Sequence, residues 1–200
     1  MRRVLAFFGA FNPPTVAHVE LARFAMAQTG REGVVFVPSK SAYIQGEQGK
    51  DSAYSDALRL KMLNILAGNR PWMEVSALEL HADSQPRTYD TLCRLRDAGV
   101  EPALLIGSDK LPELEGEWLH VEDIAREFGF VCLARGADAC GALIANDPYL
   151  SALAPYIEVL ESPPELREVS STRVRALMAQ LRAVKREIID LVPGDILGML

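Results

Sequence analysis

The 200-residue sequence contains few cysteines, and none of them has the spacing of metal ligands. Cys93, Cys132 and Cys140 form no CxxC pair, and the last two stand eight residues apart. An odd number of cysteines without such spacing argues against both a disulfide framework and a zinc site. It is typical of reduced thiols in a cytoplasmic protein.

The sequence also lacks long hydrophobic runs and an excess of positive charge. No apolar stretch reaches the roughly 20 residues of a membrane span, and the one after Arg3 is too short for a secretory signal. Lysine and arginine total 21 against 27 aspartates and glutamates, which gives a net charge of −6. Because nucleic acids and anionic membranes repel such a chain, we expect it to bind neither. An anionic ligand requires a local site of a few basic groups and backbone amides.

What the sequence does contain is six short apolar runs that alternate with longer amphipathic segments. Near-continuous apolar runs between helices are typical of a parallel sheet that is covered on both faces. The expected strands are residues 4–8, 34–37, 73–80, 103–106, 128–133 and 157–160. The expected helices are residues 16–28, 54–67, 89–98, 121–127 and 170 to about 184. This alternation predicts an α/β fold with a mainly parallel sheet of five to six strands.

The chain shows no internal repeat and no low-complexity linker. We therefore predict one domain over residues 1–200, with a C-terminal helical subregion from about residue 170. Residues 39–55 form the longest expected loop, and loops of this length often cover a ligand. Residues 136–155 are rich in alanine and glycine and predict a helix plus a loop.

The first candidate site is the run Gly-Ala-Phe-Asn-Pro-Pro-Thr-Val-Ala-His at residues 9–18, which follows a strand and opens a helix. In an open parallel sheet the loop after the first strand lies at the carboxyl edge, where ligands bind. Gly9 lets the backbone approach a ligand, and Thr15 is a natural helix cap. His18 then faces the same spot at the positive helix end, which suits a phosphate. The alternative is a tight turn in which His18 only satisfies a local hydrogen bond.

The second candidate site is the run Val-Ser-Ser-Thr-Arg-Val-Arg at residues 169–175, where the last helix begins. Ser170 or Ser171 can cap this helix, and Arg175 lies one turn further on, beside Ser171 and Thr172. Hydroxyls, amides and a guanidinium together form a clamp for a terminal phosphate. The alternative is an ordinary capped helix with solvated arginines.

The two runs occur in the order found in a known group of enzymes. The first resembles the (H/T)xGH signature of the nucleotidyltransferase α/β-phosphodiesterase superfamily, with Thr15 in its first position and Ala17 where glycine is more frequent. The second resembles the ISSTxxR motif, which in these enzymes holds the β- and γ-phosphates of ATP. The threonine form of the first motif is similar to the nicotinate and nicotinamide mononucleotide adenylyltransferase family. The resemblance spans nearly the whole chain and implies a Rossmann-like, doubly wound sheet.

Further segments resemble parts of this family that contact the mononucleotide. Asp109, in a Gly-x-Asp run after the fourth strand, matches an aspartate that binds ribose hydroxyls. Trp118 matches a tryptophan that stacks on the pyridine ring. Thr88 matches a residue that caps the next helix and offers its amide to the pyridine substituent, while Arg87 stands where the family usually has tyrosine. Arg135 matches an arginine near the nucleotide.

Each of these assignments has a plainer structural alternative. Asp109 could cap the following helical turn, Trp118 could belong to the core, and Arg135 could be a solvated charge at a strand end. The loop after Pro38 departs from the family, because it lacks the Pro-Pro-His-Lys run of many bacterial nicotinate enzymes. Its Lys40 is expected to be solvated.

The resemblance implies adenylyl transfer from ATP to a pyridine mononucleotide, with nicotinate mononucleotide preferred, to give the dinucleotide and pyrophosphate in NAD biosynthesis. The catalytic groups that it implies are Thr15, His18 and Arg175. It implies ATP contacts for these three and for Gly9, Ala10, Phe11, Gly107, Ser170, Ser171 and Thr172, and mononucleotide contacts for Thr88, Asp109, Trp118 and Arg135.

The chemistry requires little from the protein beyond alignment and charge neutralisation, because the mononucleotide phosphate is itself the nucleophile. We expect Mg²⁺ to be bound mainly through the ATP phosphates, without a metal site of protein ligands. The expected partners are small molecules, and a homo-oligomer is left open. A pantetheine-phosphate adenylyltransferase, a cytidylyltransferase-like enzyme and a non-catalytic nucleotide-binding sensor of the same fold are the alternatives.

Overall fold

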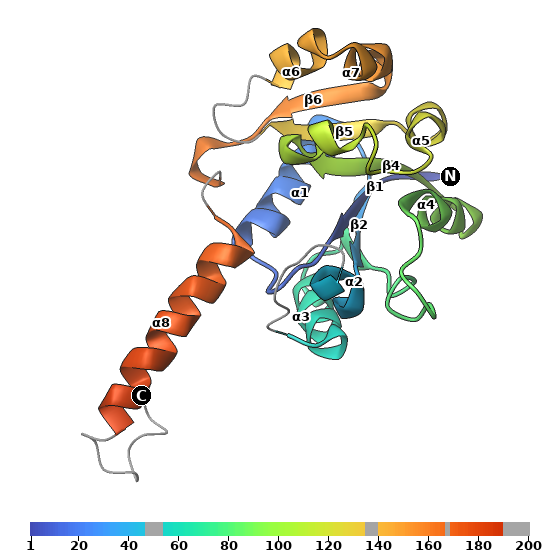
Figure 1. The fold of residues 1–200 in the computed structure, drawn as a ribbon. Helices are drawn as coiled ribbons and strands as arrows, with labels where there is room; N and C mark the ends of the chain where they lie inside the picture. The colour runs from blue at the N-terminus through green and yellow to red at the C-terminus, as the bar shows by residue number, and fades with distance from the viewer. Residues whose placement is uncertain (47–53, 135–139, 167–168, 190–200) are drawn as a thin grey trace.

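The computed structural model describes residues 1–46, 54–134, 140–166 and 169–189, without the side chains of residues 45, 46 and 182–189. Its strands form one parallel sheet in the spatial order β3-β2-β1-β4-β5-β6 (Figure 1). The strands are β1 (Arg2–Gly9), β2 (Gly33–Pro38), β3 (Met73–Val75), β4 (Val100–Gly107), β5 (Phe130–Ala134) and β6 (Ile157–Glu161). The predicted α/β fold with a parallel, doubly wound sheet is confirmed.

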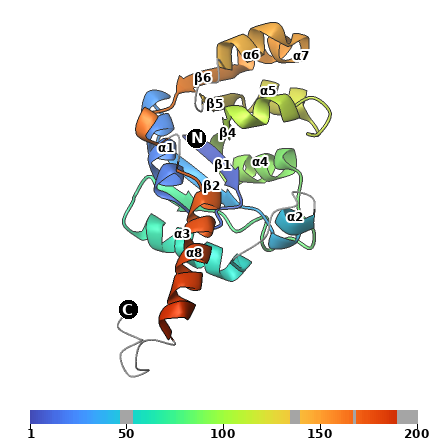
Figure 2. The same cartoon turned by 60° about the vertical axis from the view of Figure 1, so that its left-hand side comes forward.

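Helices cover both faces of the sheet, which Figure 2 shows from a second direction. One face packs against α1 (Val16–Gln28) and α3 (Asp56–Gly68). The other packs against α4 (Thr88–Asp97), α5 (Val121–Glu127), α6 (Cys140–Asn146) and α7 (Pro148–Leu153). Side chains of β1 alternate between the two cores: Leu5 joins the first, whereas Val4 and Ala6 join the second. This alternation is the period of two that a strand imposes.

Several element boundaries differ from those predicted. Helices α1 and α5 have the predicted bounds, but β3 ends at Val75 instead of continuing to residue 80. After the end of β3, Glu79 turns inward and binds polar side chains. The expected loop at 39–55 begins with a short helix, α2 (Ser41–Gly46), whose Ile44 is buried; residues 47–53 lie outside the described part. Residues 136–155 contain two helices, α6 and α7, instead of one.

The sheet reverses its strand order between β1 and β4. These strands are neighbours in the sheet, although two strands and four helices separate them along the chain. The connections after these two strands run in opposite directions, so a crevice opens above their carboxyl ends. Gly9 ends β1 and Gly107 ends β4 at this place. The first candidate site and the Gly-x-Asp segment are therefore brought to the same edge of the sheet.

The last helix, α8 (Ser171–Ile189), begins beside the start of α1 and runs away from the sheet (Figures 1 and 2). Ser170 caps it, which is one of the two predicted caps, and the helix continues beyond the predicted end near residue 184. No helix in the described part of the chain is both long and apolar enough to cross a membrane.

Candidate active site

The loop between β1 and α1 holds His18 in one orientation. Thr15 caps α1 as predicted, because its hydroxyl accepts from the His18 backbone N–H at 3.4 Å. In return, His18 Nδ1 accepts from the Thr15 backbone N–H at 3.0 Å and lies 2.7 Å from Thr15 Oγ1. A backbone N–H can only donate, so Nδ1 is the acceptor and the neutral ring carries its proton on Nε2. This capping box presents an imidazole N–H donor at the positive end of a helix.

An aromatic cluster packs against the same loop. The Phe11 ring is buried and lies 5.4 Å from Phe7, 5.4 Å from Phe36 and 5.2 Å from the His18 ring. A Cβ atom at Gly9 would come within 3.2 Å of the Phe11 ring, so a larger residue here would require that ring to shift. The Phe11 side chain therefore belongs to the core, and only its backbone is left for a nucleotide.

The second candidate site docks directly on this loop. Ser171 Oγ donates to the Pro13 main-chain oxygen at 2.8 Å, and Arg175 Nη1 donates to the Asn12 oxygen at 2.8 Å. The other Arg175 nitrogen, Nη2, donates to Thr172 Oγ1 at 3.2 Å. These bonds use two of the five guanidinium N–H groups. The two motifs, more than 150 residues apart in the sequence, thus form one surface.

Two helix N-termini converge at that surface. Thr15 caps α1, and Ser170 caps α8 by accepting from the Arg173 backbone N–H at 3.2 Å. Each helix end carries about half a positive charge and several N–H groups without partners inside the helix. Together with His18 and Arg175, they gather hydrogen-bond donors and positive charge at one surface of an acidic chain. Arrangements of this kind bind phosphate groups.

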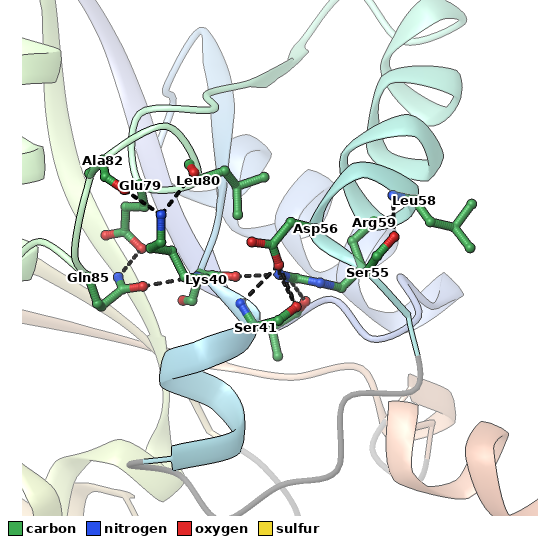
Figure 3. A network of polar contacts seen from close by, with 12 residues as sticks. Lys40, Ser41, Ser55, Asp56, Leu58, Arg59, Glu79, Leu80, Ala82 and Gln85 are labelled. Carbon is green, nitrogen blue, oxygen red and sulfur yellow. Dashed lines mark hydrogen bonds and ion pairs between the residues drawn. The ribbon is translucent and has the colours of Figure 1, made fainter.

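A buried arginine that the sequence analysis did not identify supports the loop from behind (Figure 3). The Arg59 side chain is completely buried and donates to the main-chain oxygens of Ala10 and Ser39. It is paired with Asp56 at 2.6 Å. Burial works to raise the pKa of Asp56, but hydrogen bonds from Ser41 and Arg59 hold that pKa below its usual value. Arg59 therefore ties the loop after β1 to the end of β2 and to α3.

A cleft of about 710 Å³ adjoins the carboxyl ends of β1 and β4. Its wall includes Phe8, the residue directly before the first candidate site. Thr88 and Trp118, two of the predicted mononucleotide residues, both line it. Trp118 is half-buried and packs against the core with one part of its surface, so it has both a structural contact and a face toward the cleft.

Helix α4 opens onto this cleft without a side-chain cap. Its N-cap is Arg87, which makes no capping hydrogen bond, so the expectation that Thr88 caps the helix is wrong by one residue. The first N–H groups of α4 remain as donors beside Thr88. Of the two cations in the wall, Lys110 is paired with Glu113 at 2.6 Å, whereas no carboxylate pairs with Arg87 within the described residues.

The Gly-x-Asp segment lies where expected at the end of β4, although Asp109 does not cap a helix. Gly107 is the N-cap of a short 3₁₀ helix (Ser108–Glu113), and the exposed Asp109 is its second residue. Asp109 is not among the described residues that line the cleft. It lies at the carboxyl edge of the sheet, where the loop after β1 also lies. Arg135 falls within residues 135–139, outside the described part of the chain.

A second polar network holds the outer wall of the cleft (Figure 3). Glu79 is 1% exposed, accepts from Thr91 Oγ1 at 3.2 Å and from Gln85 Nε2, and also accepts from the Ser39 hydroxyl. Gln85 Oε1 accepts from the Lys40 backbone N–H at 2.9 Å. Lys40 Nζ donates to the main-chain oxygens of residues 80 and 82, so the expectation that Lys40 is solvated is wrong. Burial raises the pKa of Glu79 to about 7.

Known proteins are similar to this chain over most of its length. A probable nicotinate-nucleotide adenylyltransferase of Caldicellulosiruptor bescii is 25% identical over 92% of this chain and 90% of the relative. The corresponding protein of Listeria welshimeri is 29% identical over 84% of this chain and 81% of the relative.

Solved structures with the same fold are more distant in sequence. The Plasmodium falciparum nicotinic acid mononucleotide adenylyltransferase, in complex with NaAD, superposes with a TM-score of 0.67 at 17% identity, over 88% of this chain and 83% of that one. The family model described as cytidylyltransferase-like matches residues 6–177, which include both motifs. This chain belongs to the cytidylyltransferase-like family.

Proposed function

We propose that this protein transfers the adenylyl group of ATP to a pyridine mononucleotide, nicotinate mononucleotide by preference, and releases pyrophosphate. The observation that carries the proposal is the docking of Ser171 and Arg175 on the Asn12–Pro13 backbone. It joins two phosphate-binding elements into one surface beside a cleft that contains an aromatic platform. The curated relatives named as nicotinate-nucleotide adenylyltransferases support the same reaction.

In the proposed reaction, an oxygen of the mononucleotide phosphate forms a bond to the α-phosphorus of ATP. The bond from that phosphorus to the bridging oxygen breaks, and the electron pair leaves with pyrophosphate. The Nε2–H of His18 stabilises the charge that develops at the α-phosphate, with Thr15 holding the ring. Ser170, Thr172 and the remaining donors of Arg175 hold the departing phosphates. No general base is required, because the nucleophile is already an anion.

The residues present fit a Mg²⁺ ion that is carried by the nucleotide. Within the described part of the chain, no group of three or more His, Cys, Asp or Glu side chains could hold a metal ion. We therefore propose that the phosphates and water supply most of the ligands, as is usual for this cation. When bound, Mg²⁺ neutralises phosphate charge. The protein contributes the helix ends and Arg175 around it.

The cleft suits the pyridine end of the mononucleotide. The Trp118 indole offers a flat surface for a cationic ring. The free N–H groups at the start of α4, beside Thr88, are donors and so fit a carboxylate, and Arg87 adds a positive charge to the wall. An amide substituent needs an acceptor as well as donors, so the donor groups at the start of α4 favour nicotinate over nicotinamide mononucleotide.

Pyrophosphate release with purified protein tests the proposal. ATP is offered with nicotinate mononucleotide, nicotinamide mononucleotide or phosphopantetheine, and CTP with the same acceptors. We expect turnover with ATP and nicotinate mononucleotide that exceeds the nicotinamide reaction by about tenfold or more in kcat/KM. Turnover only with phosphopantetheine or only with CTP would assign the chain to a different reaction. ATP binding without turnover on any acceptor would indicate a nucleotide sensor.

A further inference from the structure

Glu79 is a buried acid in the wall of the cleft that the proposed reaction uses for the pyridine ring. It follows β3, and its carboxyl oxygens accept from Thr91 on α4 and from Gln85 on the segment that leads into α4. Thr88, at the start of the same helix, lines the cleft with it. Neither the adenylyl transfer step nor the phosphate-binding surface requires this carboxyl group.

The immediate partners of Glu79 are neutral. They are the Gln85 amide and the hydroxyls of Thr91 and Ser39, and no charged side chain of the described residues is among the interactions that alter its acidity. The titratable groups on the elements packed around it include Lys40 and Tyr43 after β2, Asp56 and Arg59 on α3, His81, Asp83 and Arg87 on the following segment, Tyr89, Asp90 and Cys93 on α4, and Lys110, Glu113 and Glu117 after β4. Its charge is therefore not cancelled by a bonded cation.

Burial without a cationic partner has a predictable effect on such a group. The charged form loses its hydration, and three neutral donors compensate only in part. The pKa of Glu79 is accordingly raised to about 7. Both the neutral and the charged form are populated near neutral pH.

We propose that Glu79 is a specificity-determining residue of this cleft: its charge state sets the discrimination between a pyridine mononucleotide that carries a carboxylate and one that carries a carboxamide. The inference rests on the proposed function, because it takes the cleft as the pyridine subsite. A charged Glu79 repels the nicotinate carboxylate through a wall from which water is excluded, where charges interact more strongly than in water. The neutral carboxamide experiences no such repulsion. Binding of nicotinate mononucleotide therefore favours the protonated form and takes up a proton.

Glu79→Gln is a suitable probe because the network can accept an amide. The Gln85 side chain is oriented by its bond to the Lys40 backbone, so its Nε2 still points at position 79 and meets the oxygen of the new amide. The new NH₂ group then donates to the hydroxyls of Thr91 and Ser39, which can accept as well as donate. The variant keeps the shape of the neutral form and removes the charge.

The experiment measures binding of each mononucleotide between pH 6 and pH 8 by calorimetry, in the presence of a non-hydrolysable ATP analogue. The ratio of the two dissociation constants cancels titration of the phosphate, which both ligands carry. For the wild type we expect the preference for nicotinate mononucleotide to fall about fivefold over this range, which corresponds to a shift of one pKa unit on binding. Repeating the titrations at pH 7 in two buffers of different ionisation enthalpy should show net proton uptake for the nicotinate ligand only.

In Glu79→Gln the ratio should stay constant with pH, and the proton uptake should disappear. Thr91→Val removes a donor that favours the charged form, so the midpoint of the pH dependence should move upward. A simple structural role would not produce that shift.

A wild-type ratio that does not change with pH, or an unchanged pH dependence in Glu79→Gln, would overturn the inference. These outcomes differ from failure of the proposed function, which would appear as a wild-type protein that binds neither mononucleotide or releases no pyrophosphate.

Discussion

The Arg175 guanidinium donates a 2.8 Å hydrogen bond to the main-chain oxygen of Asn12, which stands 163 residues earlier in the chain. The bond joins the second turn of α8 to the loop after β1. It brings the N-terminus of α8 against the N-terminus of α1, so that both positive helix ends face one place. The candidate phosphate site depends on this contact as much as on the residues of either motif.

Replacement of Arg175 by alanine should weaken ATP binding about tenfold to a hundredfold, because it removes a guanidinium from the β- and γ-phosphates. AMP lacks these phosphates and should lose less. Titrations with ATP, ADP and AMP provide the measurement. Arg173→Ala, which changes an exposed arginine on the same turn, is the control and should bind all three like the wild type. Equal weakening of the three nucleotides by Arg175→Ala would place Arg175 away from the terminal phosphates.

His18→Ala should lower kcat about a hundredfold to a thousandfold, because it deletes one donor to the charge that develops at the α-phosphate. ATP affinity should change much less, since the interaction strengthens in the transition state. Steady-state kinetics with both substrates measures the two effects separately. Thr15→Ser keeps the hydroxyl beside Nδ1 and should retain most activity. Near-normal turnover in His18→Ala would remove the histidine from the reaction.

Arg59→Met should destabilise the fold by about 3–5 kcal/mol, because it leaves the Asp56 carboxylate and two buried main-chain oxygens without their donor. Urea unfolding followed by circular dichroism gives the free energy. Lys61→Met, on the same helix but exposed, should change it by less than about 0.5 kcal/mol. If the two variants were equally stable, the buried guanidinium would not hold the loop.

The free energy of unfolding should depend on pH through Glu79. Burial raises the pKa of this group to about 7, above its value of 4.5 in an unfolded chain. The folded state therefore binds more protons between these two values, and stability from this group is complete below pH 4.5 and lost as the pH rises to 7.

Glu79→Gln cannot lose this contribution. Its stability relative to the wild type should be about 2.5 kcal/mol more favourable at pH 8 than at pH 5. Guanidinium unfolding at the two pH values measures the difference. A relative stability that is the same at both pH values would show that Glu79 ionises normally in the folded protein.

The fold could be predicted from the sequence because its signals are local. Apolar runs marked all six strands, and Thr15 marked the start of α1 correctly, since a cap depends only on residues within one turn. The start of α4 was misplaced by one residue, and β3 was predicted too long. Both errors concern segments whose ends are decided by contacts with other parts of the chain.

Buried charges could not be predicted in this way. The sequence around each of these residues, which are Arg59, Glu79 and Lys40, is as compatible with a solvated side chain as with one that bonds inside the protein. Asp56 lies three residues before Arg59, but such pairs are common on exposed helix surfaces. Only the burial of each group, which comes from packing of distant elements, shows that it binds main-chain or neutral partners.

The sequence by itself determined the alternation of strands and helices, the two motifs and the residues that can meet a phosphate, because these depend on periodicity and on short-range hydrogen bonding. The tertiary structure decided that the two motifs form one surface, that Arg87 stands in the cleft wall with Thr88 and Trp118, and that Glu79 is sealed into it. The physical reason is that every residue has a main-chain carbonyl group, so the sequence does not show which carbonyl oxygen will accept a hydrogen bond from a distant side chain. Which guanidinium reaches it, and which carboxyl group loses its water, is settled only when distant segments pack together.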